Sequence, residues 1–237
     1  MPATFNIQTF SDSGLGSGSL RDAIIQSNTT YQNQTNIINL GPGYYGLNLT
    51  GQFDDTAATG DLDITGNQTM LIQGSGAGVT VISAQQIDRV FQVIGSGVTV
   101  TFKNLTITGG LLSANPNDQI YNPTDRYDDH YSKLYGGGIL STNANVTLDH
   151  VAVSSNVTRA GMFAEGGGVY ASGGTLTIQN STISNNLATY TTQLRPLPQA
   201  FNGARGADAP SDPLGTSTPP DGYPGGSGLD GEFAALR

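Results

Sequence analysis

The 237-residue sequence contains no cysteine. Disulfide bonds, thiol nucleophiles and cysteine metal sites are therefore excluded together. Charged residues are also scarce, at 11% of the chain compared with about a quarter in ordinary soluble domains. No apolar run approaches the length of a transmembrane helix, so we expect no membrane insertion. Residues 1–5 have neither a basic start nor an apolar stretch, which predicts no signal peptide at this start; an export signal would have been removed, or export would use another route.

Positive charge is in short supply. Nine Lys and Arg residues stand against 18 Asp and Glu residues, which gives a net charge of −9. This balance argues against nucleic acid as a partner and against an anionic membrane surface, because phosphates would be repelled. Glycine is abundant, with 33 residues, and short runs of Val, Ile and Leu are separated by Asn, Thr and Ser. Such a composition favours many short strands joined by tight turns over a helical bundle.

A thirty-residue repeat dominates the middle of the sequence, where residues 136–156 align without a gap with residues 166–186. Similar segments begin at Thr99 and Thr69. In each copy apolar and polar residues alternate, which predicts strands with one face toward a core. The side chains expected to point inward are Val100, Phe102, Leu105, Ile107, Val146, Leu148, Val151, Val153, Leu176, Ile178 and Ile183.

The apolar phase flips at two-residue steps, which predicts a sharp corner at each of them. The steps are Lys103-Asn104, Asp149-His150 and Gln179-Asn180. Asn tolerates the left-handed backbone that such a corner needs, and stacked Asn amides can hydrogen-bond between repeats, although His150 would interrupt that ladder. Gly triplets at 136–138 and 166–168 predict a further corner. The predicted fold is all-β: a right-handed parallel β-helix, or solenoid, of about 30 residues and three short strands per repeat, here called a coil.

The two ends of the sequence differ from its middle. Residues 19–27 predict a short helix with Ser19 as N-cap, Asp22 at position N3, and an apolar face that would cap the first coil. We therefore expect the β-helix to span residues 1–190, with an inserted loop at about 111–135. Residues 191–237 are rich in Pro and Gly and read as a loop or disordered tail, within which residues 225–231 resemble the lead-in of a further coil.

Three phrases carry a resemblance to a known family. Residues 13–24, which contain Gly-Ser-Leu-Arg-Asp-Ala-Ile, resemble the start of bacterial surface and secreted β-helix proteins with a CSLREA-type domain. Residues 60–65 and 88–93 are similar to other phrases of that group, and the Gly triplets and Thr-Ile-Ser-Asn-Asn segment resemble the wider pectate-lyase-like superfamily. The resemblance covers about residues 5–190, without the family's Cys. It implies an exported bacterial protein, extracellular or at the cell surface, with an adhesin-like role.

The insertion at 113–135 is the most distinctive local feature. It combines aromatic, acidic and basic side chains, which suits a loop that binds sugar through Tyr rings and holds Ca²⁺ through carboxylates. The alternative is a solvated loop that packs its Tyr residues on the neighbouring coil. The candidate ligand-binding residues are Tyr121, Asp125, Arg126, Tyr127, Asp128, Asp129, His130 and Tyr131, and the candidate Ca²⁺ ligands are Asp125, Asp128 and Asp129.

A second acidic cluster lies earlier in the chain, at Asp54, Asp55, Asp61 and Asp63. Two interpretations stand: a Ca²⁺ site, or exposed turn residues. The spacing matches no EF-hand and no glycine-aspartate nonapeptide repeat, so the turn interpretation is the simpler one.

The leading functional hypothesis is a non-enzymatic exported module, structural or adhesin-like, with a polysaccharide or a cell-surface glycan as its partner. The alternative is a pectate-lyase-like polysaccharide lyase or a glycoside hydrolase acting beside the 113–135 insertion. A lyase needs a basic side chain that removes a proton beside a carboxylate, together with a cation such as Ca²⁺ that makes this proton more acidic. Lys103 is a candidate for the base, but it has no acidic neighbour in its own coil. A hydrolase needs two facing carboxylates, for which Asp149 and the pair Asp128/Asp129 are the candidates. A third hypothesis is a fragment whose open final coil associates edge to edge.

Overall fold

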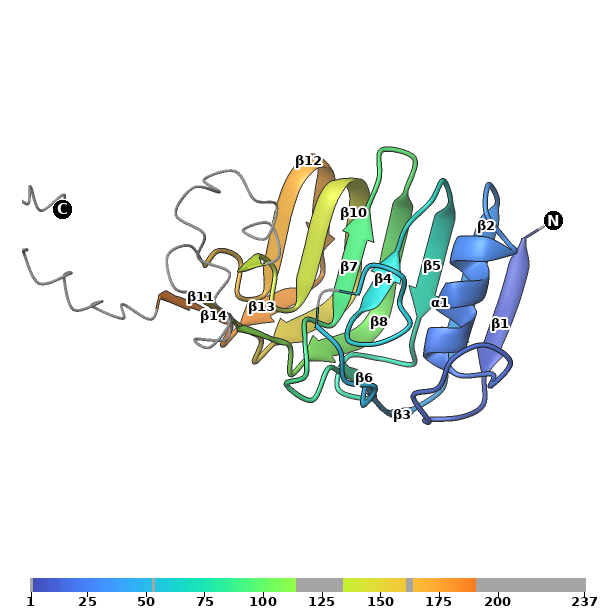
Figure 1. Cartoon of the computed structure of the whole chain (residues 1–237), viewed down its shortest axis with the longest axis horizontal. Helices are drawn as coiled ribbons and strands as arrows, with labels where there is room; N and C mark the ends of the chain where they lie inside the picture. Colours follow the sequence, from blue (N-terminus) through green and yellow to red (C-terminus); the bar gives the residue numbers. More distant parts are fainter. Residues whose placement is uncertain (1, 53, 114–133, 161–163, 191–237) are drawn as a thin grey trace, which may run out of the picture. The chain divides into compact units, whose positions relative to one another are not determined.

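The computed structural model describes residues 2–52, 54–113, 134–160 and 164–190 (Figure 1). All of them belong to one compact unit, Met1–Gln193. The segment 191–237, expected to be a loop or tail, and most of the predicted insertion lie outside the described residues.

About half of the described residues lie in strands, most of which are short. The first part contains β1 (Ala3–Ile7), α1 (Leu20–Thr29), β2 (Thr35–Leu40), β3 (Gly43–Gly46), β4 (Leu62–Ile64), β5 (Thr69–Gln73), β6 (Thr80–Ser83) and β7 (Phe91–Ile94). The second part contains β8 (Thr99–Thr108), β9 (Leu111–Ser113), β10 (Ile139–Ser154), β11 (Val157–Ala160), β12 (Val169–Gln179), β13 (Thr182–Ser184) and β14 (Leu187–Tyr190).

Every strand pair in the described residues is parallel, and the larger sheet curls on itself. The long strand β10 pairs with β7 over its first residues and with β8 over the rest, while β12 and β13 lie on its other edge. Asn145 lies beside Thr175, one thirty-residue repeat away, and Thr69 lies beside Thr99. The prediction of an all-β fold is confirmed, as a curled, all-parallel sheet with one short helix among the described residues.

A fourth short strand follows the three predicted for each coil. Strands β9, β11 and β14 form a small parallel sheet of their own. Leu111–Ser113, which the sequence places inside the insertion, therefore belongs to this regular sheet as β9. The hydrophobic alternation in this segment is too short to separate a strand from a loop.

Inward-facing side chains stack in columns between successive coils. Ile72, Phe102 and Leu148 are in register with one another and fully buried, and the predicted inward residues of β8 and β10 are all buried. Ile178 continues this column but is 46% exposed, because no described strand lies beyond β12. The alternation therefore identified the correct face in the last coil, where only the burial is incomplete.

The predicted corners are confirmed by the backbone. Asn104, His150 and Asn180 have φ values of 54°, 56° and 51°, in the left-handed region that Asn tolerates best. Gly136 and Gly166, with φ values of 70° and 62°, form the glycine corner.

A buried amide ladder occurs at a corner that the sequence did not single out. Asn156 donates from Nδ2 to Oδ1 of Asn186 at 3.0 Å, and its own Oδ1 accepts from the main-chain N–H of Gly110 at 2.9 Å. Asn156 also donates to the carbonyl of Ile107 at 3.2 Å. The ladder therefore satisfies backbone groups of two neighbouring coils through side chains of the second and third.

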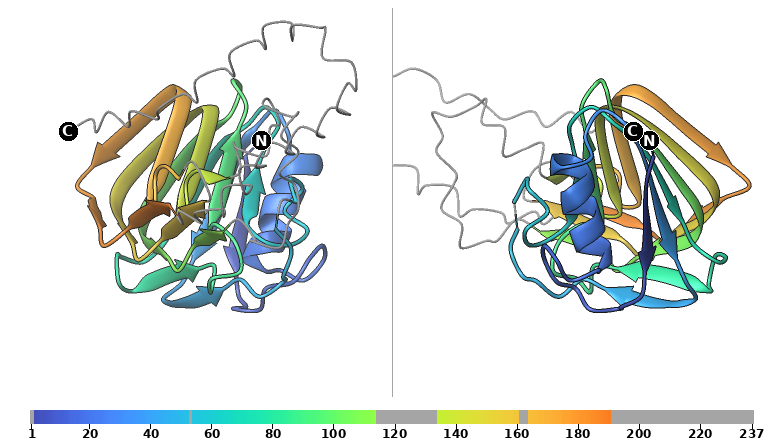
Figure 2. Two further views of the ribbon diagram at one scale, coloured as in Figure 1. Left: turned by 60° about the vertical axis from the view of Figure 1, so that its left-hand side comes forward. Right: turned by 90° about the vertical axis from the view of Figure 1, so that its right-hand side faces the viewer.

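Helix α1 begins as expected, because the Ser19 side chain accepts a hydrogen bond from the N–H of Asp22. Its apolar face, which includes Leu20, Ala23 and Ile24, packs into the core. Seen from the N-terminal end, α1 stands along one side of the curled sheet (Figure 2). On that side β4 is the first strand of the row that continues through β7 and β10. The helix therefore takes the position that a strand occupies in later coils.

Candidate functional site

A buried arginine from α1 organises the segment that leads into β4. Arg21 is fully buried and forms a two-pronged ion pair with Asp12, with Nε–Oδ1 and Nη2–Oδ2 distances of 2.6 and 3.2 Å. Its remaining N–H groups donate to main-chain carbonyls of Ala57, Thr59, Gly60 and Asp61. The guanidinium group therefore holds residues 57–61 in place by hydrogen bonds that no apolar side chain could supply.

Asn28, near the end of α1, binds the free edge of β4. Its Nδ2 donates to the carbonyl of Asp63 at 2.6 Å, and its Oδ1 accepts from the N–H of Thr65 at 3.1 Å. The Oδ1 also accepts from Nε2 of Gln68 at 2.8 Å. An edge strand otherwise exposes unpaired backbone groups, so Asn28 and Arg21 together close this edge.

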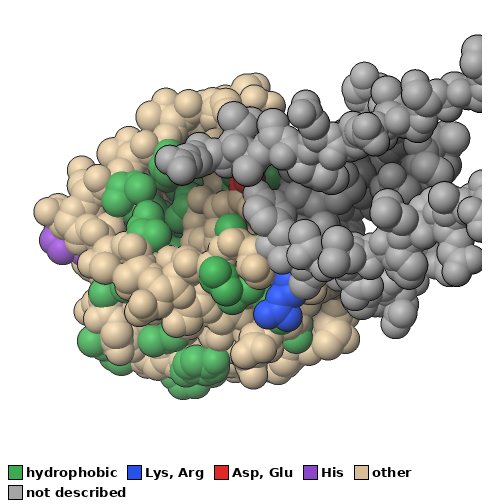
Figure 3. Space-filling model, turned by 90° about the vertical axis from the view of Figure 1, so that its left-hand side faces the viewer, with side chains coloured by type: hydrophobic (Ala, Val, Ile, Leu, Met, Phe, Trp, Pro, Cys, Tyr) green, Lys and Arg blue, Asp and Glu red, His purple; other side chains and the backbone are tan. Residues whose placement is uncertain are grey.

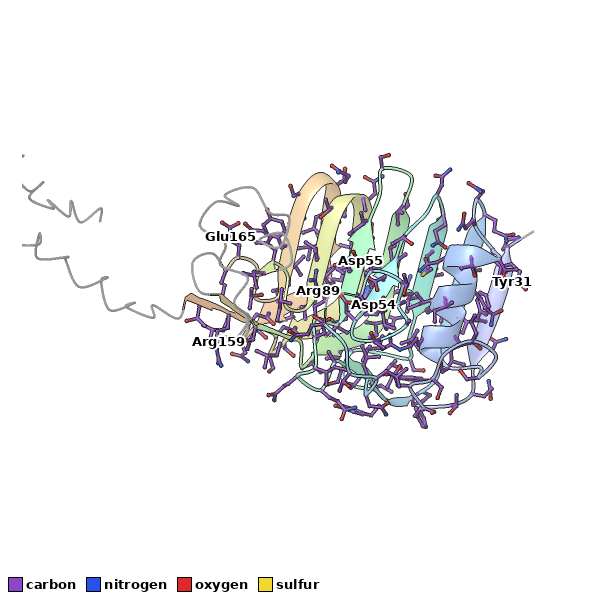
Figure 4. All side chains as sticks on the ribbon, in the orientation of Figure 1. Tyr31, Asp54, Asp55, Arg89, Arg159 and Glu165 are labelled. Atoms are coloured by element: carbon purple, nitrogen blue, oxygen red, sulfur yellow. The ribbon has the colours of Figure 1, made fainter. Side chains whose placement is uncertain are left out.

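A second buried arginine joins β4 to β7. Arg89 lies 3.0 Å from the carboxylate of Asp61, and both side chains are 2% exposed. Nη1 of Arg89 donates to Gln92, whose amide donates in turn to Asp55 at 2.9 Å. Asp55 and Arg89, both labelled in Figure 4, are thus linked through one side chain of β7. This chain of contacts connects the buried ion pair with an exposed carboxylate of the 54–60 segment.

Asp63 lies on β4 beneath the same segment. Its Oδ2 accepts from the N–H of Ala57 at 2.7 Å, while its Oδ1 is buried without a hydrogen-bond partner among the described residues. Burial raises the pKa of Asp63 to about 8, although the hydrogen bond from Ala57 and the positive charge of Arg89 act in the opposite direction. Burial also raises the pKa of Asp61 well above its usual range, with Arg89 opposing. The positive charge of Arg89 therefore opposes the rise in the pKa of both carboxyl groups, and burial outweighs it.

Asp54 has the opposite behaviour. Burial alone would raise the pKa of its carboxyl group, but hydrogen bonds from Thr56 and Thr59 outweigh burial and lower it. The second acidic cluster therefore divides in two. Asp54 and Asp55 lie in the turn, whereas Asp61 and Asp63 are buried, so the interpretation of all four as exposed turn residues is wrong. No group of three or more His, Asp or Glu side chains in the described ranges is arranged to hold a metal ion.

The chemistry of this network is limited by its burial. Carboxyl groups with a raised pKa beside an arginine are the components of a general acid. Here Asp61, Asp63 and Arg89 are at most 2% exposed, and the N–H of Ala57, in the segment 54–60, binds the carboxylate of Asp63. A substrate would have to displace that segment, which Arg21 holds from the other side. The arrangement as it stands stabilises the N-terminal end of the fold.

On the outer surface, Lys103 has an acidic neighbour in the next coil. Its Nζ lies 3.2 Å from Oδ2 of Asp149, whose other oxygen lies 2.7 Å from Nδ1 of His150. The hydrogen bond from His150 and the contact with Lys103 lower the pKa of Asp149. The candidate base for a lyase is therefore engaged in an ion pair, and the proposed partners of Asp149 in a hydrolase, Asp128 and Asp129, lie outside the described residues.

A shallow open groove of about 290 Å³ crosses the corner between early coils. Its lining is polar and contains no titratable side chain: Asn33, Gln34, Thr35, Asn67, Gln68, Thr69 and Gly97. Asn67 and Asn33 are joined by an amide hydrogen bond of 3.1 Å at its rim. The groove offers hydrogen bonds but no group for acid–base chemistry.

None of the candidate ligand-binding residues of the insertion lies within the described ranges. Tyr121, Asp125, Arg126, Tyr127, Asp128, Asp129, His130 and Tyr131, with the candidate Ca²⁺ ligands among them, therefore stay predictions. Of the insertion's tyrosines, Tyr135 is described, and its ring stacks on Tyr170 of the next coil with centroids 4.5 Å apart. This contact is of the kind expected from a loop that packs its Tyr residues on a neighbouring coil.

Both arginines of the network and two of its acidic residues come from the three phrases that carry the family resemblance. Arg21 lies in 13–24, Asp61 and Asp63 in 60–65, and Arg89 in 88–93. The sequence alone does not indicate that these phrases lie beside one another in the fold. The sequence signal that could have revealed the network is charge within apolar segments, since Asp61 and Asp63 alternate with Leu62 and Ile64.

No helix in the described part of the chain is long and apolar enough to cross a membrane.

Comparisons with known proteins identify no relative of this chain. No family model, no curated protein and no solved structure matches the chain.

Proposed function

We propose that the chain is a right-handed parallel β-helix from an exported bacterial protein, related to the CSLREA-type group, and that it serves as a rigid structural or adhesin-like module. The observation that carries this proposal is that the charged side chains near the N-terminal end of the sheet are buried and bind other parts of the fold. Arg21, Arg89, Asp61 and Asp63 lock the N-terminal end of the sheet and are buried.

The β-helix is supported by the strand register. Each coil returns beside the one before with parallel pairing, and the inward columns run through five coils from Ile38 to Ile178. Parallel strands joined by a crossover in one sheet adopt right-handed connections in nearly all proteins, which favours the right-handed form. Coils of this kind stabilise one another by stacking, because no coil buries its apolar face alone.

The family relationship is supported by the location of the shared phrases. Residues 13–24, 60–65 and 88–93 meet in one buried network that closes the edge of β4. A first coil needs such a cap, since it otherwise exposes core and backbone. A sequence that shares these phrases is therefore expected to share the same N-terminal cap.

A module that binds rather than cleaves is supported by the state of the candidate catalytic groups. Lys103 and Asp149 neutralise each other, and the two carboxyl groups with a raised pKa, Asp61 and Asp63, are buried. The insertion leaves the coil after β9 and returns at Leu134, so a scaffold of stacked coils would present it from one corner. In this proposal, the Tyr and Asp residues of the insertion contact the glycan.

The test uses the full chain with a panel of acidic and neutral polysaccharides, with and without Ca²⁺. Cleavage is followed by new reducing ends and by the ultraviolet absorbance of unsaturated products, and binding is measured on a glycan array with the same samples. We expect no cleavage, and glycan binding that is lost in Tyr127→Ala. The control Asp208→Ala removes an acid outside the 113–135 insertion and should bind normally. Reproducible cleavage abolished by Asp129→Ala would establish the enzymatic alternative and overturn the proposal.

A further inference from the structure

The segment 54–60, which leads toward β4, is strained at a buried residue. Ala57 has a φ value of 59° and is fully buried. In this left-handed conformation the Cβ atom of a residue other than glycine crowds the backbone, and alanine has no polar side chain that could compensate locally. The conformation of Ala57 is therefore imposed by the contacts that surround it.

Two ionisable side chains bind the main chain of Ala57, one on each side of the residue. The carboxyl group of Asp63 accepts from its N–H at 2.7 Å, and Nη1 of Arg21 donates to its carbonyl at 2.9 Å. Arg21 is itself neutralised by Asp12. An arginine keeps its charge in proteins at any ordinary pH, so this contact is constant. Asp63 is the one of the two side chains whose charge can change.

The surroundings of Asp63 do not suit a charge. Its side chain is fully buried, and its Oδ1 has no hydrogen-bond partner among the described residues. No ion pair within the described residues involves Asp63, because Arg89 is paired at 3.0 Å with Asp61. An ionised carboxylate in this position loses its hydration without a full set of partners, which favours the protonated form. Burial accordingly raises the pKa of Asp63 to about 8.

Charged side chains are sparse on the face of the molecule drawn in Figure 3, but they gather inside the fold around Asp63. Arg89 favours the ionised form of Asp63, whereas the carboxylates of Asp54 and Asp55 disfavour it. On the neighbouring strand β7, Gln92 is the residue in register with Asp63, and it is neutral. The charged or titratable groups that face this cluster from the elements around it are Asp54, Asp55, Asp61, Asp88, Arg21 and Arg89.

We propose that the segment 54–60 is a pH-operated latch on β4, which is closed while Asp63 is protonated and opens at Ala57 when Asp63 is ionised. Opening gives the carboxyl group of Asp63 access to water and relieves the backbone of Ala57. Between pH 3.8, the ordinary pKa, and about pH 8, the closed form holds a proton that the open form has lost. Each pH unit in this window therefore favours opening by about tenfold. The latch is independent of glycan binding by the insertion.

Hydrogen exchange of the full chain, measured by NMR between pH 5 and pH 7, tests the latch. After correction for the intrinsic exchange rate, the protection factor of the Ala57 amide should fall by about 100-fold over these two pH units. Asp63→Asn keeps the acceptor oxygen but cannot ionise, so the protection of Ala57 in this variant should not depend on pH. Asp54→Asn is the matched control. It removes an acid of the same segment whose lowered pKa keeps it ionised throughout, so the fall should persist.

Urea separates opening of the latch from unfolding of the whole chain. Opening a few residues exposes little surface, so the exchange of Ala57 should be insensitive to low concentrations of urea. Leu148 in β10 is fully buried in the core and should exchange by global unfolding, which urea accelerates. This comparison needs no substitution, so it decides the question even if Asp63→Asn does not fold.

Three results would overturn the proposal. A protection factor of Ala57 that stays constant from pH 5 to pH 7 would show that no proton holds the segment closed. A pH dependence that persists in Asp63→Asn would assign the effect to another group. Equal protection and equal urea dependence for Ala57 and Leu148 would show that Ala57 exchanges only when the whole chain unfolds, so that no separate latch exists.

Discussion

Replacing Asp63 by asparagine should flatten the dependence of stability on pH. Asp63 is buried on β4 and accepts a hydrogen bond from the N–H of Ala57. Asparagine retains an oxygen for that bond and a similar shape, but it cannot ionise. The Asp63→Asn variant therefore removes the titration of this side chain while preserving its main contact.

The magnitude follows from the raised pKa. The carboxyl group of Asp63 has a pKa of about 8 in the folded chain, compared with the ordinary value of 3.8. Between these values the folded chain holds a proton that the unfolded chain has lost, so the free energy of unfolding falls as pH rises. Below this window the stabilisation is fully present, and above about pH 8 it is lost. At about 1.4 kcal/mol per pKa unit, Asp63 alone removes about 4 kcal/mol between pH 5 and pH 9.

The assay is urea-induced unfolding of wild type and variant at both pH values, followed by circular dichroism. The difference in unfolding free energy between variant and wild type should grow by about 4 kcal/mol from pH 5 to pH 9, in favour of the variant. Asp55→Asn is the matched control: it removes a nearby exposed charge but leaves Asp63 able to titrate, so the steep loss should persist. Parallel pH profiles for wild type and Asp63→Asn would refute the reasoning, because Asp63 would then titrate alike in the folded and unfolded chains.

Three further changes test other parts of the fold. Deletion of residues 136–165 joins Tyr135 to Gly166 in phase, because Tyr135 pairs with Glu165, and should yield a folded chain with one coil fewer by circular dichroism; a deletion of residues 136–164 shifts the register by one residue and should not fold. Arg21→Met leaves the buried carboxylate of Asp12 without its counter-ion and several carbonyls without their donor, and should lower the unfolding free energy by about 3–5 kcal/mol in urea titrations. Asn156→Ala leaves buried groups of the neighbouring coil unpaired and should cost about 2–4 kcal/mol by the same measurement, whereas the same change at an exposed Asn, such as Asn67, should cost less than about 1 kcal/mol.

Much of the fold was predictable because it is periodic. The alternation in residues 99–108 and 145–154 identified Phe102, Leu148 and their neighbours as core, and all of them are buried. The two-residue steps predicted corners, and Asn104, His150 and Asn180 have the expected positive φ. These features repeat at thirty residues, so each copy strengthened the prediction made from the others.

The irregular parts were less predictable, for physical reasons. The strand β9 is three residues long, which is too short to show a period. The ladder formed by Asn156 and Asn186 depends on backbone groups in neighbouring coils, and Asn residues are too common in this sequence for one pair to stand out. Burial of Asp61 and Asp63 depends on tertiary contacts, such as the hydrogen bond from the N–H of Ala57 to Asp63, which no local pattern indicates.

By itself, the sequence determined the all-β class, the coil length, the inward face of most strands and the corner residues, because these follow from repeated local preferences of backbone and side chain. Tertiary structure alone decided that residues 13–24, 60–65 and 88–93 meet, since Arg21, Asp61 and Arg89 are far apart along the chain and adjacent only once the coils are stacked. It also decided that α1, through Asn28, binds the edge of β4, which has no strand partner on that side among the described residues. Such differences depend on what lies beside a coil, and a repeat sequence describes each coil without its neighbours.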